Sequence, residues 1–311
     1  GNVLVTTEYH DRSEFDVAER EFMLEAGAIS PTWLLPQREL GTLLFALDQD
    51  LPGAFDLSST VLYAYEDVNQ KFTRNGEIET QSPVTHRWSA SAGLGYQPFG
   101  DWRFVLDGTI SRVATDSDFT NFDAQTGEIT LHVNDYHDEF DTWSVDLKGD
   151  GTLFRLPGGP VRLAVGGAWR EDDLISTRVW RLPANGWQLR ADDAREVASA
   201  FAEMYVPIVG SRQGYAWARR IELSLAGRYD DYSDFGSTAN PKFGIVWSPI
   251  DSLDVRASIS SSFRAPTIAE KALVTRGMQI STGMLEAPDG SGAQIPTFFL
   301  QGSAPITSEQ S

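Results

Sequence analysis

Apolar and polar residues alternate one by one along several stretches of this chain. The clearest stretch begins at Ile221, where every second position is apolar or aromatic: Ile221, Leu223, Leu225, Gly227 and Tyr229. The positions between them are mostly polar: Glu222, Ser224, Ala226, Arg228 and Asp230. Successive side chains of a β-strand point to opposite faces, so this alternation predicts a strand with one apolar and one polar face. The pattern returns over 242–248 and 253–260.

Extended along the chain, this pattern predicts eleven antiparallel strands. They cover residues 2–11, 40–51, 54–67, 86–97, 102–114, 140–155, 161–172, 195–207, 219–231, 239–248 and 253–264. Residues that break strands and supply turn dihedrals mark short connections at 51–53, 98–101, 156–160 and 248–252. Most other connections are long, at 12–39, 68–85, 115–139, 173–194 and 265–311. We therefore expect an all-β fold with short turns at one end of the sheet and long loops at the other.

Alternation alone fits two architectures. A soluble sandwich covers its apolar face with a second sheet, whereas an outer-membrane barrel turns that face to lipid and its polar face to a wet lumen. Long loops gathered at one end are typical of the barrel. Aromatic residues near strand ends, on the apolar positions, also suit the girdles that such barrels place at the membrane surfaces. They are Tyr63, Tyr65, Tyr96, Trp102, Trp143, Trp169, Tyr229, Trp247 and Phe263.

Composition narrows the classes of function. The 311 residues include 25 Lys and Arg against 44 Asp and Glu, which gives a net charge of −19. Nucleic acid is not an expected partner, because binding phosphates requires a basic face. No apolar run approaches the roughly 20 residues of a membrane helix. The chain has no cysteine, so neither disulfides nor thiolate chemistry are expected.

No sequence signature of catalysis is present. The chain lacks the G-x-S-x-G, H-E-x-x-H and G-x-x-x-x-G-K-[ST] patterns, so we expect neither an enzyme nor a cofactor. His132 and His137 lie in a predicted loop that is rich in Asp and Glu, which are metal-ligand residue types. The spacing does not match a calcium loop, because Asn121 and Gly127 stand where that loop needs Gly and Glu. We expect a solvated acidic loop without a metal.

Four short motifs carry a resemblance to a known family. They are Tyr229-Asp230-Asp231-Tyr232, Phe235-Gly236, Asn240-Pro241-Lys242-Phe243-Gly244 and Ser262-Phe263-Arg264-Ala265-Pro266. With the strand pattern, they resemble the barrel portion of TonB-dependent outer-membrane receptors. The resemblance is specific over about 195–266 and is one of pattern alone upstream. A structural role is expected for the signature residues Asn240, Pro241, Lys242, Phe263, Arg264, Ala265 and Pro266, with Pro241 near the start of a strand.

The resemblance implies an antiparallel transmembrane β-barrel segment, about half of a barrel of roughly 22 strands. We expect residues 1–311 to be one partial barrel, with the signal peptide, the plug domain, the TonB box and the C-terminal strands outside the chain. The implied location is the outer membrane of a Gram-negative bacterium.

The resemblance also implies active import of a scarce nutrient of the siderophore, cobalamin, carbohydrate or peptide class. The implied partners are the TonB–ExbB–ExbD complex, reached through the missing N-terminal region, a small-molecule substrate and outer-membrane lipid. The candidate substrate-binding residues lie in an outer loop and the upper lumen: Arg228, Tyr229, Asp230, Asp231, Tyr232 and Arg264. The alternative is a soluble, secreted β-rich ligand-binding module.

Overall fold

The computed structural model describes the backbone of residues 1–181, 187–210, 213, 215, 217–268, 279–286, 294–301 and 309–310. Side chains are described for 1–130, 136–179, 190–210, 213, 215 and 217–268. These residues form two compact units, Gly1–Ser260 and Ser261–Ser311.

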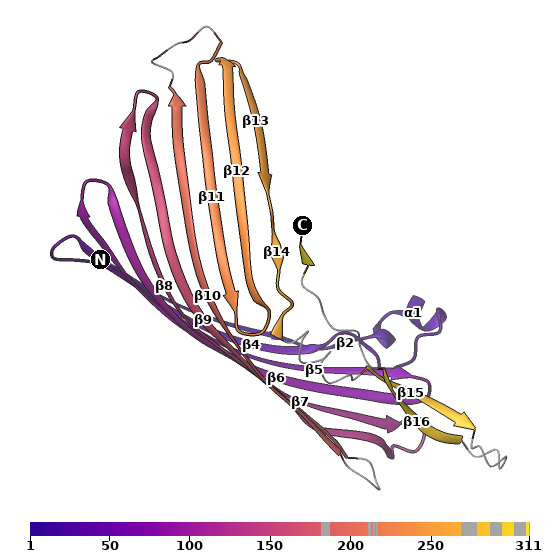
Figure 1. The fold of residues 1–311 in the computed structure, drawn as a ribbon. Coiled ribbons are helices and arrows are strands. Elements are labelled where there is room, and N and C mark those ends of the chain that lie inside the picture. Colours follow the sequence, from indigo (N-terminus) through magenta and orange to yellow (C-terminus); the bar gives the residue numbers. More distant parts are fainter. Residues whose placement is uncertain are drawn as a thin grey trace. The chain divides into compact units, whose positions relative to one another are not determined.

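The first unit is built around one twisted sheet of eleven antiparallel strands (Figure 1). The strands follow one another across the sheet in chain order: β1 (Asn2–Arg12), β4 (Gln37–Leu51), β5 (Phe55–Arg74), β6 (Glu77–Phe99), β7 (Trp102–Asp123), β8 (Ile129–Leu156), β9 (Gly159–Arg181), β10 (Trp187–Val209), β11 (Arg220–Tyr232), β12 (Gly236–Ile250) and β13 (Leu253–Ser260). The predicted all-β class, strand number and antiparallel order are therefore confirmed. Within the described part of the chain, β1 and β13 are the sheet edges and do not pair with each other.

The two ends of the sheet differ in their connections. We call the end with the turns after β4, β6, β8, β10 and β12 the lower end, although Figure 1 draws it toward the top of the picture. The upper end is the one with the connections after β1, β5, β7, β9 and β11. At the upper end, β5 and β6 are joined through Asn75 and Gly76, both with positive φ. Such tight hairpin turns need residues that tolerate positive φ, and Asn and Gly are the usual choice.

Three of the long loops expected at the upper end are mostly strand, which corrects the prediction. The pairing of β5 with β6 continues to Arg74–Glu77, so residues 68–85 form a hairpin. In the same way, β7 and β8 cover most of 115–139, and β9 and β10 cover most of 173–194. With 28 residues, β8 extends for about 90 Å at 3.3 Å per residue. Inter-strand hydrogen bonds maintain these strands where the apolar alternation has ended.

The connection between β1 and β4 is long, as expected, and carries its own structure. It contains β2 (Phe15–Asp16), η1 (Val17–Glu19), α1 (Glu21–Glu25) and β3 (Trp33–Leu35). It is tied to β5 because the Thr73 backbone N–H donates to Thr32 Oγ1 at 3.0 Å. Val17 is buried at its centre. Among the described residues, no helix is long and apolar enough to cross a membrane.

One face of the large sheet is apolar and uncovered. Directly paired residues share a face, so strand register assigns each side chain to a side. The apolar face includes Val5, Phe45, Val61, Leu94, Leu106, Leu147, Val165, Leu225, Phe243 and Ile259. Leu147 is 55% exposed and Phe243 is 53% exposed. A sandwich would bury these side chains under a second sheet, and the described residues of the first unit contain no such sheet against them.

Aromatic side chains border the apolar face at two levels, which we call the lower and the upper aromatic ring. Near the lower end, Phe55 stacks on Tyr96 with ring centroids 4.3 Å apart. Further up, Trp143 of β8 and Trp169 of β9 meet with ring centroids 4.1 Å apart, and Tyr63 of β5 is directly paired with Trp88 of β6. From Phe55 to Tyr63 the strand rises about 27 Å, close to the roughly 25 Å apolar band of outer-membrane barrels. The upper ring lies in mid-strand rather than at the strand ends expected from sequence, because the strands continue beyond it.

The second unit, Ser261–Ser311, holds two small antiparallel pairs. β14 (Phe263–Arg264) pairs with β17 (Glu309–Gln310), and β15 (Gln279–Glu286) pairs with β16 (Gln294–Gln301). The strand expected at 253–264 therefore ends early, because the pairing of β13 with β12 stops at Lys242–Ser260. Much of the expected connection at 265–311 lies outside the described residues.

Candidate functional site

The face opposite the apolar band is polar and charged, and it is the candidate functional surface. Its charges pair between strands. Arg103 Nη2 of β7 reaches across β6 to lie 2.7 Å from Asp56 Oδ2 of β5, and Arg162 Nη2 of β9 lies 3.4 Å from Asp150 Oδ2 of the adjacent β8. These side chains stay a third or more exposed, so each pair contributes only about 0–1 kcal/mol. Charges that remain wet on one side of a sheet, with apolar side chains on the other, suit the lumen wall of a membrane barrel.

Two of the predicted substrate-binding residues form a compact cluster on this polar face. Arg228 Nε donates to Asp230 Oδ1 at 2.8 Å, and Arg228 Nη2 donates to Ser199 Oγ at 3.0 Å. Ser199 Oγ in turn donates to Asp230 Oδ1 at 2.6 Å, because register pairs Ser199 of β10 directly with Asp230 of β11. Asp230 is nearly buried, whereas the Arg228 side chain is 54% exposed. The exposed guanidinium edge is the part of this cluster that can meet a solute.

A second ion pair fixes the hairpin tip next to this cluster. Arg195 Nη2 on β10 lies 2.9 Å from Asp234 Oδ2 in the turn between β11 and β12. The guanidinium also lies 5.0 Å from the ring of Phe235 and 5.9 Å from that of Tyr232. Tyr232 is thus a packing partner of Arg195 at the tip. Arg195 and Asp234 were missed at the sequence level, where a lone Arg in a polar stretch gives no signal of its partner.

The other predicted binding residues lie elsewhere. Tyr229 and Asp231 are on the apolar face, since Tyr229 pairs with Ala200 and Asp231 with Ala198. Tyr229 is 48% exposed on that face, and Asp231 is exposed two residues further along the strand. Arg264 belongs to β14 in the second unit. Substrate contact by any of the six residues stays a prediction.

The signature around Pro241 lies in the middle of a strand rather than near its start. β12 begins at Gly236, and Pro241 pairs with Gly227 on the apolar face. The prolyl nitrogen cannot donate to a ladder, which is tolerated here because β13 stops pairing at Lys242 and leaves β12 with a partner on one side only. Lys242 itself points to the polar face. The Phe263–Pro266 part of the signature begins with β14 of the second unit.

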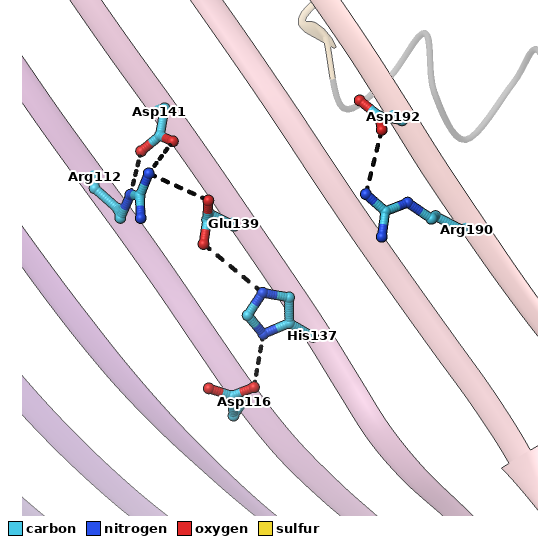
Figure 2. A network of polar contacts seen from close by, with 7 residues as sticks. All are labelled: Arg112, Asp116, His137, Glu139, Asp141, Arg190 and Asp192. Atoms are coloured by element: carbon cyan, nitrogen blue, oxygen red, sulfur yellow. Dashed lines mark hydrogen bonds and ion pairs between the residues drawn. The ribbon is translucent and has the colours of Figure 1, made fainter.

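Above the upper aromatic ring, the apolar face becomes a network of charges (Figure 2). Arg112 on β7 contacts Asp141 at 2.6 Å and Glu139 at 3.4 Å, both on β8. His137 Nδ1 meets Asp116 Oδ1 at 2.7 Å. The predicted acidic loop containing His137 is thus an ion-paired part of two strands, which corrects its assignment as a loop; the His132 side chain lies outside the described ones.

The change from apolar to charged side chains is abrupt on this face. The indole N–H of Trp143 donates to Glu171 Oε2 at 2.7 Å, so the ring packs with Trp169 while its polar edge meets the first charged row. A Trp with one apolar and one hydrogen-bonded side is typical of a membrane–water boundary. This boundary marks the upper limit of the band.

Two Asp residues stabilise turns outside the apolar band. At the lower end, Asp101 accepts hydrogen bonds from the Thr152 hydroxyl and backbone N–H, and these bonds lower the pKa of Asp101. At the upper end, Asp123 accepts from the backbone N–H groups of Thr126 and Gln125, which lowers the pKa of Asp123. In both cases the hydrogen bonds favour the ionised carboxylate.

A twisted antiparallel sheet with a lipid-compatible band, two aromatic rings and a wet charged face defines the wall of a membrane β-barrel. A model of the family described as TonB dependent receptor-like, beta-barrel matches residues 36–310, and the chain belongs to this family. The predicted family is therefore confirmed. Because the family consists of transport receptors, the expectation that the chain is not an enzyme is confirmed as well. Family membership also goes against the soluble binding module.

One solved structure shares the fold. The structure of the RagAB peptide transporter is similar with a TM-score of 0.59 at 8% identity, over 88% of this chain and 37% of that chain. The beta domain of the Bordetella autotransporter Brka gives a TM-score of only 0.30 at 14% identity, over 73% of this chain and 84% of that chain, and does not share the fold to a useful degree. Among curated proteins, none matches the chain by sequence.

Proposed function

We propose that residues 1–311 form part of the wall of an outer-membrane barrel that actively imports a small-molecule nutrient. The single observation that carries this proposal is the division of the sheet into an apolar band between two aromatic rings and an opposite face lined with charges. That division supports a wall between lipid and a wet passage. Family membership supports energy supply by the TonB–ExbB–ExbD complex and a location in the outer membrane of a Gram-negative bacterium.

The cargo class is a further part of the proposal. Siderophore, cobalamin, carbohydrate and peptide cargo all fit a wet, charged passage. The fold shared with the RagAB peptide transporter makes peptides the first class to test. On the polar face, the exposed guanidinium of Arg228 beside Asp230 is the best candidate among the predicted residues for a contact with cargo near the upper end.

Uptake by intact cells tests the function. A strain lacking the gene should lose uptake of one labelled nutrient among short peptides, iron–siderophores, cobalamin and oligosaccharides. Loss of TonB should abolish the same uptake, because active import needs the energy-transducing complex. Uptake that persists without the gene, or recovery of the receptor in the soluble fraction without detergent, would contradict the proposal.

A further inference from the structure

We propose that the β10–β11 connection at the lower end of the sheet binds one phosphatidylethanolamine molecule, with the lipid phosphate at Arg219 and the lipid ammonium group at Asp251. This assignment rests on the proposed function, because it requires the apolar face to lie in the outer membrane with its lower end at the phospholipid leaflet. It adds to that function a specific lipid and a position for its headgroup on the outside of the wall.

The β10–β11 connection differs from the other turns at the lower end. Two or three residues separate the strands at those turns, whereas residues 210–219 separate β10 from β11. A turn closes part of this connection, because the Ala218 backbone N–H donates to Tyr215 O at 3.2 Å. Connections that exceed what the sheet needs are common places for binding surfaces.

A hydrogen bond holds this connection beside the apolar face. The indole N–H of Trp247 on β12 donates to Trp217 O at 3.0 Å. Trp247 is directly paired with Ile221 of β11 and lies on the apolar face, three residues from the lower end of its strand. The bond therefore places the Trp217 backbone at the lower edge of the apolar band, next to the part of the sheet that suits lipid.

Aromatic side chains at this edge are open to lipid. Trp217 is 60% exposed and Tyr215 is 48% exposed, and their rings stack with centroids 6.0 Å apart. Trp and Tyr favour the headgroup level of a membrane, because each has an apolar ring and a polar edge. Further up β12, Ile245 and Phe243 continue the exposed apolar row. The acyl chains of a lipid whose headgroup lies at the connection can follow this row.

Two opposite charges lie side by side at the same edge. Arg219 immediately precedes β11, and alternation from Ile221 places it on the side of the apolar face. The Arg219 Nε atom lies 3.9 Å from Asp251 Oδ1 in the β12–β13 turn, which is beyond hydrogen-bond length. The two side chains are 48% and 85% exposed.

Both charged groups keep hydrogen-bonding capacity for a ligand. Apart from their mutual contact, Arg219 and Asp251 make no ion pair or side-chain hydrogen bond with residues whose side chains the structure describes. The guanidinium can therefore donate to phosphate oxygens, and the carboxylate can accept from an ammonium group.

This pair of charges discriminates between phospholipid headgroups. Phosphatidylethanolamine carries a phosphate and a primary ammonium joined by two carbons, so its opposite charges are neighbours, as those of Arg219 and Asp251 are. Phosphatidylglycerol has no ammonium and would leave Asp251 beside a second negative group. Phosphatidylcholine has no N–H to donate, because its ammonium is fully methylated. Only the first of these headgroups matches both side chains.

Native mass spectrometry of the purified full-length receptor tests the assignment. The receptor is released from micelles that contain equal amounts of phosphatidylethanolamine, phosphatidylcholine and phosphatidylglycerol with the same acyl chains. It should retain one phosphatidylethanolamine in about tenfold excess over either other lipid, since each of those lacks a charge-assisted hydrogen bond. Equal retention of the three lipids, or a preference for another one, would overturn the assignment.

A methylation series and a soluble headgroup separate the two halves of the lipid. Retention should fall stepwise from phosphatidylethanolamine through its N-methyl and N,N-dimethyl forms to phosphatidylcholine, as N–H donors are lost. Glycerophosphoethanolamine, which has the headgroup without acyl chains, should not displace the lipid, because the apolar row contributes to binding. Unchanged retention along the series, or displacement by the soluble headgroup, would count against a phosphatidylethanolamine site.

Charge variants locate the binding at this edge. Arg219→Gln and Asp251→Asn should each reduce the preference for phosphatidylethanolamine about tenfold. Arg256→Gln is the matched control and should keep the preference, since Arg256 is an exposed polar-face residue on the neighbouring strand β13. Trp217→Ala should weaken retention of all three lipids alike, because it removes a ring contact and no charge. An unchanged preference in both charge variants would place the lipid elsewhere and overturn the assignment.

This lipid assay is independent of the transport assay. Selective retention with these variant effects, but without TonB-dependent uptake in cells, would keep the lipid site and remove the import function. TonB-dependent uptake by a receptor that retains the three lipids equally would do the reverse.

Discussion

Arg195 and Asp234 are 39 residues apart in sequence and form an ion pair at the tip of the β11–β12 hairpin. Their side chains are only 5% and 9% exposed, so the pair is shielded from solvent. The ion pair links the β11–β12 turn, which belongs to the family signature, to the neighbouring strand β10. Its role is to hold the tip in place, next to the Arg228–Asp230 cluster on the polar face.

Replacing Asp234 with Ala should lower the free energy of unfolding by about 3–5 kcal/mol, because it leaves the buried Arg195 charge without its partner. Asp231→Ala is the matched control on the same hairpin, and as an exposed substitution it should stay within about 0.5 kcal/mol. Urea unfolding of the receptor in lipid vesicles, followed by tryptophan fluorescence, measures both. An Asp234→Ala loss no larger than that of Asp231→Ala would show that the pair does not stabilise the tip.

A lysine at position 147 should destabilise the membrane-inserted receptor far more than a lysine at position 146. Leu147 lies in the apolar band, and its neighbour Asp146 lies on the polar face. A Lys facing the middle of the bilayer costs about 2–4 kcal/mol, whereas a lumen-facing Lys avoids that cost. The same unfolding measurement on Leu147→Lys and Asp146→Lys tests this. Equal losses would contradict the assignment of the two faces.

Cysteine labelling should place the two ends of the sheet on opposite sides of the membrane. The chain has no native cysteine, so single introduced thiols are unambiguous. Gln125→Cys, at the upper β7–β8 tip, should react with a membrane-impermeant maleimide in intact cells. Asp251→Cys, in the lower β12–β13 turn, should react only after the outer membrane is opened. The reverse pattern would invert the orientation proposed for the barrel.

Acid should loosen the β7–β8 tip. The pKa of Asp123 is lowered by the backbone N–H groups of Thr126 and Gln125, so the ionised carboxylate is favoured in the folded tip. The stabilisation is present above the pKa of an unfolded Asp, about 3.9, and is lost as pH falls through the lower folded value. Amide NMR signals of Gln125 and Thr126 should therefore titrate with a midpoint below about 3.9.

Asp123→Ala provides the control for this titration, because it removes the carboxylate and should remove the transition from both amides. A midpoint at or above the ordinary Asp value in the unsubstituted protein would show that these hydrogen bonds do not favour the charged form.

Sequence patterns predicted the sheet best where its two faces differ. The ends expected for β11 and β12 agree with Arg220–Tyr232 and Gly236–Ile250 to within three residues, since apolar and polar positions alternate almost throughout. Residues 115–123 are polar at nearly every position, so the upper part of β7 was taken for a loop. Its strand persists through backbone pairing with β6 and β8, as in the Asp116–His137 pair.

The site was less predictable than the fold, because its contacts depend on register between distant segments. The signature directed attention to Arg228 and Asp230, which do meet on the polar face. Their companion Ser199 and the Arg195–Asp234 pair come together only because β10 pairs with β11.

Because the upper hairpins remain paired with one another, the upper end of the sheet should move as one unit rather than as separate hairpins. From Tyr63 to Arg74, β5 rises about 37 Å beyond the upper aromatic ring while still paired with β6. Bending one tip outward would shear the hydrogen bonds of its neighbours as well. A solute arriving at such a rim meets a surface that is already ordered, so little conformational entropy is lost on contact. Selectivity there should follow from shape, and insertions should be tolerated at the few residues that cap each hairpin.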